Sequence, residues 1–258
     1  MGGREAADPP SPRLRGTKEE GKLQMETPTL REMLAAGVHF GHKRARWNPK
    51  MEEFIFATKN GVSIINLEKT GEMLGRTLEF IAKEVSEGKN VVFVTSKRQA
   101  RDIVKEAAES CGMPYVVEKW RGGTLTNWDI VSKNFKTLKN LNEQIASPEF
   151  AKISNIEQNK VKEKAAKIER IFGGLADLKK KPDILFLIGA YDEQIALKEA
   201  RNVGIKIVAL ADTNANPEEV DFAIPANDDA TKSIKLMVDT VAVTIKENLP
   251  KKTEDKPI

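Results

Sequence analysis

The residues with the greatest potential for chemistry gather in one short segment, HFGHKRARWNPKM, at residues 39–51. This segment holds both histidines of the chain, four lysines and arginines, one tryptophan and no acid. Histidines could bind a metal or act in catalysis, whereas a run of cations suits a membrane surface or a nucleic acid. Each of these four interpretations makes a different demand on the rest of the chain.

A metal site is not expected in this segment. His39 and His42 could share one helical face, but Gly41 lies between them and no third ligand is near. A tight zinc site needs two or three further nitrogen, oxygen or sulfur ligands, and the one cysteine, Cys111, is far away in sequence. The histidines are therefore either packing residues at a helix end or RNA contacts, and both interpretations stay open.

An enzyme of the α/β class would place its polar residues at the carboxyl ends of its strands. The candidates there are residues 95–97, Gly189 with Asp192, and residues 212–214. Helix capping and turn chemistry explain these residues, and Asp212 has no titratable partner at a recognisable spacing. Because phosphate-loop and hydrolase motifs are missing as well, the sequence predicts no catalytic site, no cofactor and no small-molecule substrate.

Composition favours a soluble globular protein with a polyanionic partner. The 258 residues are 31% charged and carry a net charge of only +4. The cations are concentrated in residues 39–50 and in residues 126–181, where Lys and Arg outnumber Asp and Glu by five. An acid-free segment and a basic region on a slightly acidic body suggest a polyanionic partner.

Compartment and termini can also be assessed from composition. A single cysteine fits the reducing cytoplasm, and no apolar run approaches the length that crosses a bilayer, so no membrane contact is expected. Residues 1–27 contain five acids and no apolar core, which argues against a secretory signal or a transit peptide. We predict a disordered extension at 1–27 and a disordered tail at 249–258.

Short, continuous apolar runs predict strands that are buried on both faces, as in parallel sheets. Helical patterns alternate with these runs, which indicates an open α/β sheet with helices on both faces. The Asn60-Gly61 pair additionally predicts a β-hairpin over 54–65. The predicted strands are 90–95, 183–189 and 205–210, with weaker candidates at 115–117 and 222–224, and the predicted helices are 66–87, 97–111, 192–203 and 228–247.

Residues 126–175 interrupt this alternation with two amphipathic helical patterns on either side of Pro148. They predict an antiparallel coiled-coil hairpin inserted into a discontinuous sheet domain of residues 28–125 and 176–248. Its outer faces are rich in lysine, which a solvated surface would explain as well as RNA contact does. The seam residues are Val131, Phe135, Leu138, Val161 and Ile168.

The stretch KWRGGTLTNW at residues 119–128 leads into this hairpin. Arg121, Thr126 and Asn127 could bind ribose and phosphate groups, and the indole of Trp128 could pack on a sugar or a base. Trp128 could equally be the first core residue of the hairpin.

Four blocks of the sequence together resemble the bacterial-type small-subunit ribosomal protein S-two family. They lie in the family's order, with the helical region in the expected place, and the resemblance covers roughly residues 27–248. The blocks are residues 34–70, 111–128, 182–205 and 212–234.

This resemblance implies a Rossmann-like or flavodoxin-like α/β/α domain with an inserted coiled-coil hairpin, and a structural rather than an enzymatic role. It implies binding to 16S rRNA at the head–body junction of the 30S subunit, among other 30S proteins, and docking of the large RNA-binding protein S-one. The alternative is an α/β nucleotide-binding enzyme with a helical insert. An enzyme would concentrate its polar residues at the strand ends, whereas the cations here lie in one loop and the insert.

The opening segment is then expected to be an exposed, RNA-facing loop. Either guanidinium of Arg44 and Arg46 can bind a phosphate in a bidentate manner. Lys43 and Lys50 add point charges, and Asn48 before Pro49 favours extended backbone, which stiffens the loop. The predicted RNA-binding residues are His39, His42, Lys43, Arg44, Arg46, Trp47, Asn48, Lys50, Arg121, Thr126, Asn127 and Trp128.

Overall fold

A computed structural model describes residues 27–250, so most of the predicted extension and tail lies outside the described residues. Their centre is a five-stranded parallel sheet in which alternate side chains point to opposite faces. Phe93 and Phe186 enter one buried cluster, while Val92 and Leu185 enter the other. In spatial order the strands are β5 (Tyr115–Val116), β4 (Val91–Val94), β6 (Ile184–Ile188), β7 (Lys206–Ala211) and β8 (Phe222–Pro225).

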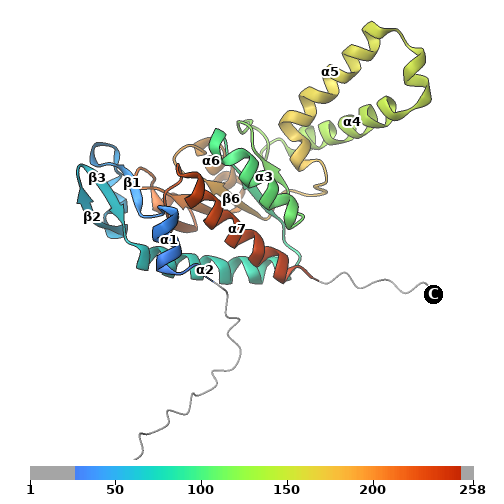
Figure 1. The fold of residues 1–258 in the computed structure, drawn as a ribbon. Coiled ribbons are helices and arrows are strands. Elements are labelled where there is room, and N and C mark those ends of the chain that lie inside the picture. The colour runs from blue at the N-terminus through green and yellow to red at the C-terminus, as the bar shows by residue number, and fades with distance from the viewer. Residues whose placement is uncertain (1–26, 251–258) are drawn as a thin grey trace, which may run out of the picture.

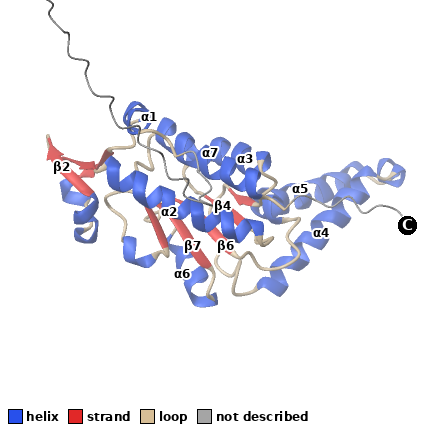
Figure 2. Ribbon diagram, turned by 90° about the horizontal axis from the view of Figure 1, so that it is seen from below, coloured by secondary structure: helices blue, strands red, loops and turns tan. Residues whose placement is uncertain are grey.

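Helices cover both faces of this sheet (Figure 2), so the predicted α/β fold class is confirmed. Three helices pack together on one face and a fourth covers the other. The strands were predictable because both of their faces are apolar. The three are α2 (Leu67–Ser86), α3 (Arg101–Ser110) and α7 (Thr231–Asn248), and the fourth is α6 (Gln194–Val203).

A small antiparallel sheet follows the first helix, α1 (Leu30–Ala36). The predicted hairpin turn is present, because Asn60 and Gly61 both have positive φ angles, of 52° and 75°. Strand β1 was not predicted, since FGHK has neither apolar alternation nor β-branched residues. The sheet consists of β1 (Phe40–Lys43), β3 (Val62–Ile65) and β2 (Ile55–Lys59), in that order.

Two helices, α4 (Trp128–Ala146) and α5 (Asn155–Phe172), form a hairpin that projects from the sheet (Figure 1). The coiled-coil geometry predicted for this pair stays a prediction. At the root of the hairpin, Val131, Phe135 and Leu175 share a buried cluster with Trp120 and the sheet. The root of the hairpin therefore packs with the sheet. We propose that only the outer part of the hairpin is a separate insert.

Candidate nucleic-acid interface

The basic segment 39–50 is attached to the carboxyl edge of the parallel sheet through the turn that follows β7. The Thr213 hydroxyl accepts a hydrogen bond from the His42 backbone N–H at 2.8 Å, and its carbonyl accepts one from the Asn48 N–H at 2.7 Å. Gly41 permits this approach, because a Cβ there would lie 2.5 Å from Thr213 Cγ2. The backbone of the segment is thus held in place by a turn 171 positions away.

The imidazole of His42 forms a second attachment. Its Nδ1 lies 3.0 Å from Asp212 and its Nε2 lies 3.4 Å from Asp229, distances that make both contacts ion pairs when the imidazole is protonated. The interaction with Asp212 raises the pKa of His42, although burial opposes the rise. Asp212 therefore does have a titratable partner, which sequence spacing could not reveal because the two residues are distant in the chain.

Lys97, just after β4, is the centre of a partly buried charge cluster beside His42. Its ammonium lies 2.5 Å from Asp228, 2.7 Å from Asp229 and 3.1 Å from Asp192. Burial lowers the pKa of Lys97, but these carboxylates outweigh burial and raise it overall. Burial raises the pKa of Asp228 to about 7 against the opposing effect of Lys97. Charged side chains therefore gather at the strand ends as well as in the loop and the insert.

The cations of segment 39–50 remain on the surface. Lys43, Arg44, Arg46 and Lys50 are all exposed. Lys50 forms an ion pair with Glu218, whereas neither arginine forms an ion pair with any of the described residues. The Arg44 guanidinium lies over the Trp47 ring, 5.8 Å from its centroid. The two arginines are therefore available to an anionic partner.

The segment is not one continuous loop, which corrects the sequence-based expectation. It comprises β1, a 3-10 turn η1 (Arg44–Arg46) and a second 3-10 helix η2 (Pro49–Phe54). Asn48 caps η2 by accepting the Lys50 backbone N–H at 3.0 Å. Trp47 and Asn48 are half-buried. They therefore contribute to the packing of the segment and present only part of their side chains to a partner.

His39 differs from His42 in its surroundings. Its ring packs on Phe40 with 4.0 Å between centroids, its Nδ1 is buried without a hydrogen-bond partner, and burial lowers its pKa. The structure thus favours a packing role for His39.

The second predicted segment, residues 119–128, is organised by the buried carboxylate of Glu199. This carboxylate accepts hydrogen bonds from the backbone N–H groups of Gly123 and Leu125 and from the Trp120 indole. Arg121, Thr126 and Asn127 are exposed.

Trp128 is half-buried, and its ring meets Phe135 edge-on at 5.7 Å between centroids. The alternative role for Trp128, as the first core residue of the hairpin, is therefore supported.

Segments 39–50 and 119–128, called the two basic segments below, flank a crevice at the carboxyl ends of β4 and β6. Its larger part has a volume of about 500 Å³ and includes His42, Arg46 and Asp192 in its lining. A smaller hollow of about 230 Å³ also borders Asp192 and reaches Lys119 and Trp120. The crevice thus extends from one predicted RNA-binding segment to the other.

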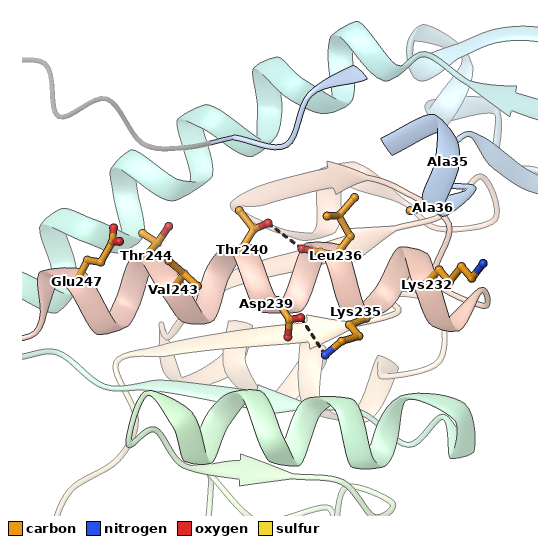
Figure 3. A pocket seen from close by; sticks show the side chains of 10 residues that line it. All are labelled: Ala35, Ala36, Lys232, Lys235, Leu236, Asp239, Thr240, Val243, Thr244 and Glu247. Carbon is orange, nitrogen blue, oxygen red and sulfur yellow. Dashed lines mark hydrogen bonds and ion pairs between the residues drawn. The ribbon is translucent and has the colours of Figure 1, made fainter. Parts of the chain in front are cut away.

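A separate groove of about 600 Å³ runs along α7 to Ala35 and Ala36 of α1 (Figure 3). Three of its polar side chains are engaged within α7 itself, since Asp239 pairs with Lys235 at 3.0 Å and Thr240 donates to the Leu236 carbonyl. These three side chains are therefore committed to contacts within the helix.

Two further findings concern residues 27–250 alone. Nowhere in this part do three or more His, Cys, Asp or Glu side chains gather so as to hold a metal ion. Its helices also include none with the length and apolar character needed to span a membrane.

Comparisons with known proteins agree with one another. The sequence model of the family described as Ribosomal protein S2 matches residues 33–248. The small ribosomal subunit protein uS2 of Shewanella halifaxensis is 46% identical over 222 residues, which cover 86% of this chain and 92% of the relative. The uS2 protein of Koribacter versatilis is 44% identical over 223 residues, which cover 86% of this chain and 74% of the relative. Both relatives are named as ribosomal proteins rather than as enzymes.

Proposed function

The chain belongs to the ribosomal protein S2 family of the small ribosomal subunit, and we propose that it binds 16S rRNA there through residues 39–50 and 119–128. The observation that carries this proposal is the pair of exposed arginines, Arg44 and Arg46, on a segment whose backbone is fixed to the sheet. Because the backbone is already fixed, less conformational freedom is lost when the two arginines bind phosphates, which favours affinity.

The second segment supports the same proposal with different chemistry. Arg121, Thr126 and Asn127 are exposed on a stretch whose backbone N–H groups are held by Glu199. Short polar side chains and guanidinium groups are the usual ligands of ribose and phosphate. We propose that this stretch contacts the RNA backbone beside the first segment.

The location within the subunit is a further part of the proposal. We expect the chain to lie at the head–body junction, beside other 30S proteins, and to help dock the large RNA-binding protein S-one. Family membership supports this placement. Small subunits isolated from cells depleted of the chain should accordingly lose S-one, and undiminished S-one would contradict this part of the proposal.

Ultraviolet crosslinking in assembled small subunits tests the proposed RNA contacts. We expect peptides from 39–50 and 119–128 to carry crosslinked 16S rRNA nucleotides. The exposed helical surface around Arg76 and Lys105 serves as the control, because both side chains pair with acids of their own helices. Crosslinks confined to that control surface, or failure of the chain to sediment with small subunits, would contradict the proposal.

A further inference from the structure

The crevice between the basic segments lies where the strand order of the sheet reverses. The chain enters the parallel sheet at β4, adds β5 on one side, and then adds β6, β7 and β8 on the other. Open α/β sheets bind ligands at the carboxyl ends of the two strands that flank such a reversal. The larger part of the crevice, with a volume of about 500 Å³, lies within the usual range for a small-ligand pocket.

The lining of the crevice suits a flat, hydrogen-bonding ring. Tyr191 is 56% exposed and offers an aromatic face. Gln99 and Asn214 add amide groups, and Asn214 Oδ1 is buried with no hydrogen-bond partner among residues 27–250. The carboxylates of Asp192 and Asp229 are 40% and 55% exposed, so their oxygens can accept further hydrogen bonds.

The charges of the crevice separate an acidic interior, where Lys97 faces three carboxylates, from a cationic rim at Arg46. Lys97 is already surrounded by Asp192, Asp228 and Asp229, so it has little attraction left for a phosphate. Arg46 is exposed and belongs to both the crevice lining and the basic segment. A ligand with an uncharged ring and one phosphate would fit, with the ring inside and the phosphate at Arg46.

We propose that the crevice binds one unstacked nucleotide of an RNA strand; this inference rests on the proposed RNA-binding function. The base stacks on Tyr191, and its exocyclic amino group donates to the carboxylates of Asp192 and Asp229. The phosphate of the same nucleotide binds Arg46. Because uracil is the one RNA base without an exocyclic amino group, the crevice prefers adenine, cytosine or guanine to uracil.

The binding of fluorescently labelled RNA hexamers to the full chain tests this inference. We expect oligoadenylate and oligocytidylate to bind more tightly than oligouridylate. Tyr191→Ala should weaken binding of the preferred hexamers by about tenfold, whereas Tyr191→Phe, which retains an aromatic face, should bind like the wild type. Asp229→Asn should reduce the difference between oligoadenylate and oligouridylate.

Several outcomes would overturn the inference. Equal binding of the three hexamers, or equal binding by wild type and Tyr191→Ala, would show that no base enters the crevice. Adenosine monophosphate that competes as strongly as the hexamer would identify a free nucleotide, not RNA, as the ligand. If Tyr191→Ala instead lowered the content of another protein in small subunits and left hexamer binding unchanged, the crevice would be a protein-docking site.

Arg44, which is not part of the crevice lining, separates this inference from the proposed function. An unchanged salt dependence of 16S rRNA binding in Arg44→Ala would reject the proposed phosphate contact of Arg44. The hexamer preference and the weaker hexamer binding of Tyr191→Ala would be unaffected by that result, since they report on the base in the crevice.

Discussion

His42 Nδ1 lies 3.0 Å from the Asp212 carboxylate and thereby joins the basic segment to the carboxyl edge of the parallel sheet. The contact links two residues that are 170 positions apart in the sequence. Because the raised pKa of His42 shows that the folded state favours imidazolium, the attachment should depend on pH.

The stability conferred by His42 should decrease as the pH rises. A histidine whose folded-state pKa exceeds its unfolded value of about 6.5 stabilises the fold fully below that value, and the stabilisation disappears above the folded-state pKa. We therefore expect the free energy of unfolding of the wild type to exceed that of His42→Gln at pH 6 by more than at pH 9. Urea unfolding at the two pH values measures this difference.

His39→Gln is the matched control. Burial lowers the pKa of His39, so its contribution to stability should change with pH in the opposite direction. Any stabilisation by neutral His39 should increase as the pH rises toward about 6.5 and remain constant above it. Asp228, with its pKa of about 7, is retained in both variants, so its titration largely cancels in the comparison. An equal pH dependence in the wild type and in His42→Gln would contradict the ion-pair attachment.

Gly41→Ala should destabilise the protein by about 1–3 kcal/mol, the usual cost of overpacking. The new Cβ would lie 2.5 Å from Thr213 Cγ2 and 3.0 Å from the Ser63 carbonyl oxygen. Gly75→Ala is the control: it lies in α2 with open space at the Cβ position, and it should stabilise by about 0.4–1 kcal/mol. Chemical denaturation measures both, and a Gly41→Ala variant as stable as the wild type would show that the segment is not docked as described.

Glu199→Gln should weaken the second segment. The glutamine amide can accept through only one oxygen, so at least one of the N–H groups of Gly123, Leu125 and Trp120 would lose its acceptor. An unsatisfied buried donor costs about 1–3 kcal/mol, which denaturant unfolding can detect. Glu79→Gln, on the exposed side of α2, should change stability by no more than about 0.5 kcal/mol. Similar stabilities for the two variants would exclude the proposed role of Glu199.

Much of the fold could be predicted because its signals are local. The strands at 184–188 and 206–211 are continuous apolar runs, and the Asn60-Gly61 turn is set by two adjacent residues. Strand β1 could not be predicted, because Gly41 and His42 do not favour a strand locally. Their roles are contacts with Thr213 and Asp212, which are distant in the sequence.

The candidate site was less predictable because its contacts join residues that are distant in the sequence. The exposure of Arg44 and Arg46 followed from an acid-free run, but the partner of Lys50 is Glu218, which no local pattern indicates. The charge cluster at Lys97 likewise forms only when the carboxyl ends of β4, β6 and β8 meet at one edge of the sheet.

The central claim is that Arg44 and Arg46 bind rRNA phosphates and contribute little to folding. Arg44→Ala/Arg46→Ala should change the free energy of unfolding by no more than about 0.5 kcal/mol per site. Arg76→Ala/Lys105→Ala removes the same charge from helices α2 and α3 and serves as the control.

The most direct measurement is the salt dependence of binding to small-subunit particles that lack this chain. For the Arg44/Arg46 variant, we predict a slope of log affinity against log salt that is shallower by roughly 0.7–0.9 per lost phosphate contact. The Arg76/Lys105 variant should keep the wild-type slope. An unchanged slope in the Arg44/Arg46 variant, together with a lower melting temperature, would contradict the account and assign the arginines to folding.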